Sequence, residues 1–394
     1  MSGINESTLE NTVLTWLENL GYDIEHGPDI AFDGVKPERD PSANYTDVVL
    51  IGRLRESLER INPEIPCEAI DEAIRKITRP ESPSLIENNQ AFHRMLTDGV
   101  DVSWMADGGE RHDKVWLLNV ENSDENDWLA VNQFTVVENK RERRPDVVLF
   151  INGLPLAVVE LKNPADEKAT IRHAFNQLQT YKDQIPSLFV YNELLVISDG
   201  LRARAGTLTA GWDRFMPWRT IDGTDLYREP GNERQTDGIV QEGLKTLIRG
   251  LFDRNRFLDY VLNFITFEHD GGDTSTISKK AAAYHQYHAV NKAVECTLSA
   301  CGIDAPRGLV YGRFLEAEKG DPFQVKEPGA QYGTGTSHFD NRRVGVIWHT
   351  QGSGKSLSMV FYAGKIIRHP YMENPTLVVV TDRNDLDDQL FGTF

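Results

Sequence analysis

Two carboxylates and a lysine in the first half of the sequence have the types and spacing of a metal-dependent phosphodiesterase. Residues 145–164 read PDVVLFINGLPLAVVELKNP and contain Asp146, Glu160 and Lys162. Glu160 and Lys162 are two residues apart in a predicted strand, so their side chains project from one face. Mg²⁺ prefers hard oxygen ligands and keeps several waters, which suits two carboxylates and a backbone carbonyl. Lys162 could then orient a metal-bound water or stabilise charge that grows on a phosphate.

The register of this predicted hairpin decides whether Asp146 can join Glu160. A regular two-residue turn at Asn152–Gly153 would place Asp146 opposite Val159, on the other side of the sheet. A three-residue loop or a bulge shifts the register by one residue and sets Asp146 opposite Glu160. Pro155 lacks the N–H that a ladder hydrogen bond needs, which also disfavours a regular hairpin. We therefore predict an odd-length loop or a bulge.

Other polar residues in the first half could complete this site, and each has a simpler alternative. Gln177 and Tyr181 are four residues apart on a predicted helix, so both could reach the phosphates beside the metal; alternatively they form a polar surface pair. Glu10 could serve the outer shell of the metal, or it could form a capping box with Ser7. The hairpin itself could be exposed and carry only a surface Glu–Lys pair, which contributes little energy.

A second set of residues, near the end of the chain, predicts a nucleotide site. Residues 344–356 (VGVIWHTQGSGKS) place an apolar stretch before a glycine-rich loop and a helix, with His349 where the strict phosphate-loop pattern has its first glycine. The backbone N–H groups of such a loop close around phosphate oxygens at a helix N-terminus. Lys355 would reach the β and γ phosphates and Ser356 the Mg²⁺. The loop residues predicted to bind are Thr350, Gln351, Gly352, Ser353, Gly354, Lys355 and Ser356.

Upstream of this loop, Gln286 has two possible roles. It lies in the predicted helix AAYHQYHAVNKAVE, where it could hydrogen-bond the edge of an adenine. The alternative is an ordinary glutamine on a helix surface.

The elements that must position these residues alternate between helix and strand, which predicts an α/β protein. A helix is expected over 5–21, strand-like segments over 114–120 and 128–137, the hairpin over 145–162 and a helix over 167–183. Helical patterns over about 231–268 form a connector, and the polar stretch that follows predicts a domain boundary near residues 260–275. The remaining elements are expected at 281–299 (helix), 344–350 (strand), 355–367 (helix) and 376–382 (strand).

The overall composition excludes several classes of protein. No apolar run approaches the roughly 20 residues that a membrane span needs, and the N-terminus lacks a secretion signal, so we predict a cytoplasmic protein without membrane contact. The three cysteines form neither a metal-binding spacing nor an even disulfide set. Since the formal net charge is −18, any DNA affinity must come from local basic clusters. One such cluster directly precedes Asp146: Lys140, Arg141, Arg143 and Arg144.

Taken together, these residues resemble the N-terminal part of the motor (restriction) subunit of type I restriction–modification enzymes. The resemblance runs along nearly the whole chain and includes LERINPEIP, NQLQTYK, DRFMPWRT, YHQYHAVNKAV and VVVTDRNDLDDQL. It implies a PD-(D/E)xK endonuclease domain with a mixed sheet over residues 1–260, followed over 261–394 by the start of a RecA-like (superfamily 2 helicase) parallel-sheet domain.

The resemblance also assigns roles to individual residues. It implies that Asp146, Glu160 and Lys162 are the catalytic set of the nuclease and that Gln177 and Tyr181 form its Q-x-x-x-Y motif. Gln286 matches the glutamine that reads adenine, and Thr350 to Ser356 match the helicase phosphate loop.

The function that the resemblance implies is Mg²⁺-dependent cleavage of double-stranded DNA, coupled in the full complex to ATP-driven translocation. The implied partners are a modification (methyltransferase) subunit and a specificity subunit. No acidic motor box or arginine finger follows Lys355, so we expect a fragment that binds ATP but does not hydrolyse it usefully alone. Residues 312–340 are long for the approach to a phosphate loop, and we assign them no function. The alternatives are a DNA-binding or docking module with an inactive nuclease site, and a stand-alone repair nuclease–helicase.

Overall fold

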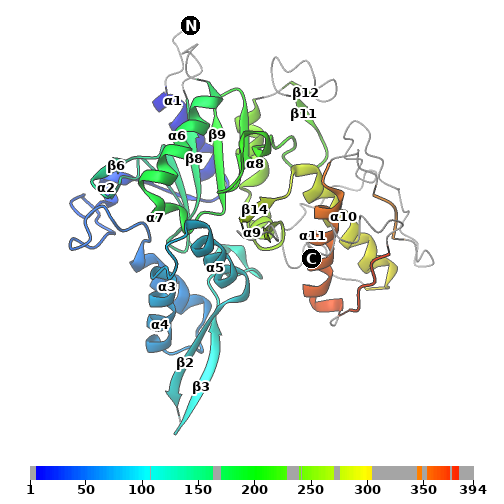
Figure 1. The fold of residues 1–394 in the computed structure, drawn as a ribbon, viewed down its shortest axis with the longest axis horizontal. Coiled ribbons are helices and arrows are strands. Elements are labelled where there is room, and N and C mark those ends of the chain that lie inside the picture. The colour runs from blue at the N-terminus through cyan, green and yellow to red at the C-terminus, as the bar shows by residue number, and fades with distance from the viewer. Residues whose placement is uncertain are drawn as a thin grey trace. The chain divides into compact units, whose positions relative to one another are not determined.

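The computed structural model describes residues 6–106, 108–162, 170–228, 239–240, 242–269, 276–303, 344–347, 353–372 and 375–380. The chain forms two compact units, Met1–Met216 and Pro217–Phe394; Figure 1 colours it from blue to red along its length. The division into a nuclease domain and a motor domain at residue 260 stays a prediction, because a compact unit and a functional domain need not share a boundary. No helix in the described ranges is long and apolar enough to cross a membrane.

A mixed sheet of six strands forms the centre of the first unit. In spatial order the strands are β1 (Asp23–His26), β4 (Trp128–Asn132), β7 (Val147–Ile151), β8 (Leu154–Leu161), β9 (Leu194–Ser198) and β10 (Ala203–Gly206). β1 is parallel to β4 and β8 to β9, whereas the other neighbours are antiparallel. Every residue of β7, β8 and β9 is buried, so both faces of the sheet are covered there. The predicted mixed α/β architecture is therefore confirmed for this unit.

Two helices pack on this sheet near its central strands. α1 (Glu6–Glu18) contacts β1, β4 and β8 through an apolar stripe that includes Val13 and Leu17. α6 (Ile171–Gln184) contacts β8 and β9 through a stripe that includes Ala174 and Leu178. Both stripes repeat at intervals of three and four residues, which is the spacing from which the helices were predicted.

The first unit also contains three longer helices, a long hairpin and several short elements. Helices α3 (Ile51–Ile61), α4 (Cys67–Thr78) and α5 (Leu85–Asp98) lie with the long hairpin of β2 (Val100–Ala106) and β3 (Gly109–Val115) on one side of the sheet (Figure 1). A strand was predicted over 114–120, but β3 ends at Val115. The smaller elements are α2 (Gly27–Ile30), β5 (Val136–Glu138), β6 (Arg141–Arg143), α7 (Pro186–Phe189), and the 3₁₀ turns η1 (Ser123–Glu125) and η2 (Trp212–Arg214).

The second unit is mainly helical where it is described. It contains α8 (Gly243–Leu251), α9 (Arg254–Asn263), α10 (Tyr284–Ala300) and α11 (Lys355–Arg368), so the helices predicted over 281–299 and 355–367 are confirmed. It also contains the hairpin of β13 (Ile265–His269) and β14 (Ile277–Ala281), the short pair β11 (Tyr227–Arg228) and β12 (Ile239–Val240), and the turn η3 (Pro370–Met372).

The strands predicted over 344–350 and 376–382 do not form in the parts that the structure describes. Residues 344–347 and 375–380 belong to no strand. The apolar side chains of Val346, Val378 and Val380 are 72%, 81% and 87% exposed. A strand needs a neighbour to pair its N–H and C=O groups, and no strand in the described ranges pairs with these residues. Ile347 forms an isolated bridge, and residues 348–350, 381 and 382 lie outside the described residues, so both strands stay predictions.

Candidate active site

The β7–β8 hairpin has the register that a shared carboxylate site requires. Asn152 and Gly153 form its turn with φ of 53° and 76°, as a two-residue type I′ turn demands. The register then shifts by one residue between Leu149 and Phe150, and beyond this bulge Val147 pairs with Val159. The next residues along the two strands, Asp146 and Glu160, are thus brought into register, and the predicted bulge is confirmed.

The tip of this hairpin is buried, which fixes the register from the far end. Asn152 is fully buried, and its side-chain amide donates to the carbonyl oxygen of Leu117 at 2.8 Å and to Oδ1 of Asn126 at 2.9 Å. Gly153 accepts a hydrogen bond from the Leu50 backbone N–H at 2.9 Å. A Cβ at position 153 would lie 2.4 Å from the Leu50 carbonyl oxygen, so only glycine fits this turn.

Asp146 and Glu160 are both buried at the other end of the hairpin. Asp146 is 8% exposed and Glu160 is 0% exposed. Oδ2 of Asp146 accepts a hydrogen bond from the Leu161 backbone N–H at 2.6 Å, and Oε1 of Glu160 accepts one from Lys162 Nζ at 2.7 Å. Oε2 of Glu160 is buried and has no hydrogen-bond partner among the described residues. The alternative of an exposed hairpin with a surface ion pair is therefore wrong.

Burial makes both carboxylates unusually hard to ionise. Burial, reinforced by the charge of Asp146, raises the pKa of Glu160 to about 8 despite the opposing effect of Lys162. Burial also raises the pKa of Asp146 to about 7, although the Leu161 N–H and the charge of Lys162 act against it. Two buried carboxylates that disfavour their own charges form an environment that a bound cation would stabilise.

The donor set fits a cation such as Mg²⁺. The described residues contain no group of three or more His, Cys, Asp or Glu side chains arranged around a metal position. Two carboxylates and the unpartnered Oε2 of Glu160 nevertheless provide hard oxygen ligands, and Mg²⁺ characteristically takes one or two carboxylates and keeps several waters.

Lys162 remains a cation beside this pair. Burial lowers the pKa of the Lys162 ammonium, but the charge and hydrogen bond of Glu160 outweigh burial, and the net pKa is raised. Its Nζ also lies 3.4 Å from Oε1 of Glu6, on α1. Sequence reasoning missed Glu6; the signal available was that Glu6 and Glu10 are four residues apart and share a face of the opening helix.

Glu10 does not form the capping box with Ser7 that was one of its two predicted roles. Ser7 lies inside α1 rather than before it, and Glu10 is a buried residue of the same helix. Oε2 of Glu10 accepts a hydrogen bond from Gln133 Nε2 at 2.9 Å. The negative charge of Glu10 also contributes to the raised pKa of Asp146. Glu10 therefore faces the carboxylate site, as the other predicted role requires.

Gln177 and Tyr181 lie on the side of α6 that faces the carboxylates. Nε2 of Gln177 donates to the Tyr181 hydroxyl at 2.5 Å, and Tyr181 is buried. Burial, followed by the charge of Glu160, raises the pKa of the Tyr181 phenol, which keeps it protonated as a hydrogen-bond donor. The alternative of an ordinary surface pair is thus wrong for Tyr181.

A polar groove with a volume of about 610 Å³ adjoins this pair. Its basic side chains are Arg143 and Arg144, two members of the cluster noted in the sequence. The full lining is Glu142, Arg143, Arg144, Asn176, Gln177, Thr180 and Tyr181. The groove therefore joins the basic cluster to the helix face that carries the Gln177–Tyr181 pair.

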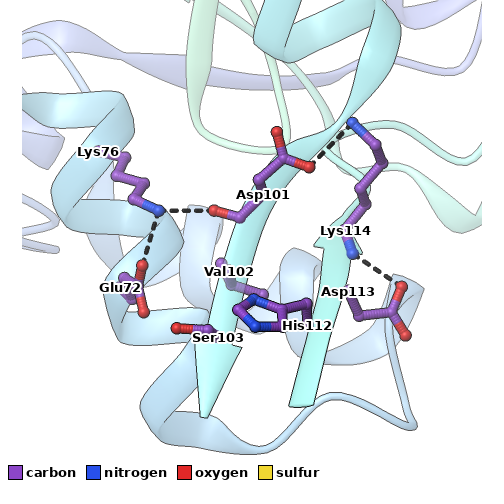
Figure 2. Close-up of a pocket in the computed structure, with 8 residues that line it drawn as sticks. All are labelled: Glu72, Lys76, Asp101, Val102, Ser103, His112, Asp113 and Lys114. Carbon is purple, nitrogen blue, oxygen red and sulfur yellow. Dashed lines mark hydrogen bonds and ion pairs between the residues drawn. The ribbon is translucent and has the colours of Figure 1, made fainter. Parts of the chain in front are cut away.

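A second hollow, of about 560 Å³, lies between α4 and the β2–β3 hairpin (Figure 2). Both of its lysines are paired, Lys76 with Glu72 at 2.6 Å and Lys114 with Asp101 at 3.1 Å, and Asp113 accepts a hydrogen bond from the Lys114 backbone N–H at 2.7 Å. We assign it no chemistry, because its two lysines are already held by carboxylates of its own lining.

The predicted nucleotide site is described only in part. Thr350, Gln351 and Gly352 lie outside the described residues, whereas 353–356 lie within them. Gly354 adopts the left-handed conformation with φ of 78°, and α11 begins at the next residue, Lys355. The exposed Lys355 therefore opens the first turn of a helix, where free N–H groups favour an anion.

Gln286 lies directly against this loop. Its side chain is 3% exposed, its Oε1 accepts from the Ala283 N–H at 2.8 Å, and its Nε2 donates to the Gly354 carbonyl oxygen at 2.9 Å. The alternative of a glutamine on the helix surface is therefore wrong. Its predicted role in reading adenine stays a prediction.

A buried ion pair holds α11 to the neighbouring helices of the second unit. Nζ of Lys365 lies 2.6 Å from Oδ1 of Asp259, on α9, and also donates to the side chain of Asn291, on α10. Sequence reasoning missed this network; the available signal was a lysine on the apolar side of the helix that follows the phosphate loop.

The chain is similar to known proteins along nearly its whole length. Residues 3–214, more than half of the chain, match the family described as Type I restriction enzyme R protein N terminus, and residues 285–394 match the SWI2/SNF2 ATPase family. The chain is similar to the Type I restriction enzyme HindI endonuclease subunit of Haemophilus influenzae, at 40% identity over 99% of this chain and 33% of that protein.

Other curated relatives match less closely. The Putative type I restriction enzyme MjaIXP endonuclease subunit of Methanocaldococcus jannaschii is 32% identical over 99% of this chain and 34% of its own length. The Type I restriction enzyme EcoprrI endonuclease subunit of Escherichia coli is 27% identical over 67% of this chain and 75% of its own length. The chain spans about a third of the length of the first two of these relatives.

Proposed function

This chain belongs to the type I restriction enzyme R protein family, and we propose that it supplies the metal-dependent nuclease site and part of the ATP-driven motor of such an enzyme. The proposed reaction is hydrolysis of a phosphodiester bond in double-stranded DNA. The observation that carries the proposal is the buried Asp146–Glu160 pair, with one Glu160 oxygen free of hydrogen bonds within the described structure. The chain spans about a third of the length of the HindI and MjaIXP subunits, so translocation and assembly with modification and specificity subunits are also proposals.

In the proposed mechanism, Asp146 and Glu160 would hold a Mg²⁺ ion, which when bound would lower the pKa of a water and offset negative charge on the phosphate. Lys162, held 2.7 Å from Glu160 and kept cationic by it, donates to the phosphate as negative charge grows there. Tyr181 stays protonated and, with Gln177, donates hydrogen bonds that orient the DNA backbone. The mixed sheet with α1 and α6 supports the assignment of a PD-(D/E)xK nuclease fold to residues 1–260.

For residues 261–394 we propose the opening of a RecA-like ATPase. The loop Thr350 to Ser356 would bind the phosphates of ATP, with Lys355 on the β and γ phosphates and Ser356 on the Mg²⁺. Gln286 would contact the adenine. The positions of Gln286 and of Lys355 at the start of α11 support this proposal, as does the match to an ATPase family.

Cleavage of supercoiled plasmid DNA tests the nuclease proposal. The wild-type residue and Glu160→Gln would be compared with Mg²⁺, both in this chain alone and in a complete R subunit assembled with modification and specificity subunits and ATP. We expect strand cleavage by the wild type in the assembled mixture and none by Glu160→Gln. Binding of DNA without cleavage by the wild type in either setting would instead favour a docking module with an inactive nuclease site.

A further inference from the structure

An arginine–tryptophan–arginine stack lies at the start of α6, outside the site described above. The guanidinium carbons of Arg172 and Arg204 lie 4.6 Å and 5.1 Å from the centre of the Trp212 ring. Phe175 supports the stack by packing edge-on against Trp212, with ring centres 5.6 Å apart. Trp212 is only half-buried and Arg172 is exposed, so the stack reaches the surface of the first unit.

The two arginines of this stack differ from the structural arginines of the same unit. Arg53 is paired with Glu38 at 2.6 Å and with Asp127 at 3.0 Å. No carboxylate within the described ranges forms an ion pair with Arg172 or Arg204. Nη1 of Arg204 donates to the Phe215 carbonyl oxygen at 3.4 Å, which does not neutralise its charge, and its buried Nε has no hydrogen-bond partner in those ranges. An arginine stacked on an aromatic face keeps the N–H groups of its planar edge available, and this geometry matches phosphate. The stack therefore offers positive charge that the described fold does not neutralise.

The stack and the polar groove lie along one exposed side of α6. Arg172, Asn176 and Thr180 are spaced by four residues and therefore share a helix face. Asn176 and Thr180 line the groove that also contains Arg143 and Arg144. Arg143 lies at the far end of the helix, because its Nε donates to Gln184 at 2.7 Å.

The spacing of these groups suits a nucleic-acid backbone. The positions from Arg172 to Gln184 span about 18 Å at 1.5 Å per helical residue. This corresponds to about five base pairs of duplex at 3.4 Å per base pair on each strand. The four elements that border this length, β6, α6, β10 and η2, carry three acidic residues, Glu142, Asp183 and Asp213, and six basic ones: Arg141, Arg143, Arg172, Lys182, Arg204 and Arg214. In a chain with a net charge of −18, such a local excess of positive charge marks a place where a polyanion can approach.

We propose that Arg172, Arg204 and Trp212 form, with the groove, a continuous track that binds the phosphate backbone of double-stranded DNA beside the carboxylate site. The proposal rests on the proposed nuclease function and extends it to residues with no part in the chemistry. Arg172 and Arg204 contact phosphates, while Trp212 holds their guanidinium planes in position.

Binding of a duplex of about 20 base pairs, followed by fluorescence anisotropy in EDTA over about 50 to 300 mM salt, tests the track. The full chain would be compared with Arg172→Gln and with Arg172→Gln/Arg204→Gln. We expect the double variant to bind at least about tenfold more weakly at low salt. Its slope of log affinity against log salt should fall by about 0.9 for each phosphate that the variant no longer neutralises. If Arg172 and Arg204 only stabilised the fold and neutralised no phosphate, this slope would be unchanged.

Matched variants separate loss of charge from loss of fold. Arg75→Gln removes an exposed arginine from α4 and should bind DNA as the wild type does. Trp212→Phe keeps an aromatic face and should retain most of the affinity, whereas Trp212→Ala should not. Because Arg172 is exposed, its single variant keeps the test valid even if the Arg204 variant unfolds. The track is overturned if Arg172→Gln binds with the affinity and slope of the wild type, or if the wild type binds no DNA at low salt.

The failure of this proposal can be told apart from the failure of the nuclease proposal. Binding in EDTA needs no hydrolysis, so Glu160→Gln should bind the duplex as the wild type does. Salt-dependent binding that requires Arg172, without any cleavage, would leave the track standing and remove the nuclease. Cleavage that is unaffected by Arg172→Gln/Arg204→Gln would support the nuclease and overturn the track.

Discussion

At the scale of single residues, the chemistry proposed for the first unit depends most on the burial of Glu160. The sequence was sufficient to select Asp146, Glu160 and Lys162, because spacing in a strand determines which side chains share a face. The complete burial of Glu160 could not be predicted, because it depends on α1 and α6 covering the sheet from distant parts of the chain. The contact between Glu6 and Lys162 could not be predicted for the same reason, because the two residues are far apart in the sequence.

We expect Glu160→Gln to stabilise the metal-free chain at high pH. The folded-state pKa of Glu160, about 8, is raised above its ordinary value. Its contribution to stability is therefore fully present below the unfolded-state pKa of about 4.3 and is lost as the pH rises through the folded-state value. Glutamine carries no charge and avoids this loss.

Thermal unfolding in EDTA from about pH 4 to pH 9 measures this effect. At the alkaline end, Glu160→Gln should have a higher melting temperature than the wild type. Its free energy of unfolding should be larger by a few kcal/mol, at about 1.4 kcal/mol per unit of pKa difference. The difference should shrink towards pH 4. A wild type that is equally or more stable than the variant at pH 9 would show that burial does not oppose the charge of Glu160.

At the scale of elements, the bulge in the β7–β8 hairpin was predictable and its cause was not. The position of the turn shows that a regular register would separate Asp146 from Glu160. Pro155, which lacks a ladder N–H, disfavours that register. The anchoring of the turn on Leu50 and on the Asn126 region depends on segments far away in the sequence. The strands expected over 344–350 and 376–382 stay predictions for a related reason, because pairing depends on a partner strand that local propensity cannot identify.

Gly153→Ala should destabilise the first unit much more than Gly108→Ala. Both glycines have positive φ, 76° and 82°, so both substitutions carry backbone strain of about 1 kcal/mol. Only at Gly153 would the added Cβ meet backbone, 2.4 Å from the Leu50 carbonyl oxygen, whereas nothing lies within 4 Å of a Cβ at Gly108. Urea unfolding should give a difference of at least about 2 kcal/mol between the variants. Equal losses would mean that the hairpin tip is not held against α3.

Removing one partner of the buried Asp259–Lys365 pair should lower the free energy of unfolding more than replacing both partners with apolar residues. Asp259→Ala leaves the Lys365 ammonium buried without its carboxylate, a change that costs about 3 to 5 kcal/mol. The double variant Asp259→Leu/Lys365→Met removes both charges and should lose considerably less. Urea unfolding of the chain, followed by near-ultraviolet circular dichroism, distinguishes the two. A double variant less stable than Asp259→Ala would show that the ion pair itself stabilises the packing of α11.

At the scale of the whole molecule, two compact units carry two different kinds of site. The first matches the N-terminal family of type I restriction R proteins, and the second overlaps the match to an ATPase family. Sequence motifs selected the residues of both candidate sites, because each motif is a short local pattern. They did not locate the Arg172–Trp212–Arg204 stack, whose members come from α6, β10 and η2 and meet only in the folded unit.

Calorimetric titration of the nucleotide-free chain with Mn²⁺, a stand-in for Mg²⁺ that binds the same hard ligands, tests the central claim most directly. We predict one binding event that is lost in Asp146→Asn and in Glu160→Gln. The event should be unchanged in Ser356→Ala, whose hydroxyl serves a cation only beside a nucleotide. Mn²⁺ binding that survives both carboxylate variants, or that disappears in Ser356→Ala, would contradict the assignment of the metal to the buried carboxylate pair.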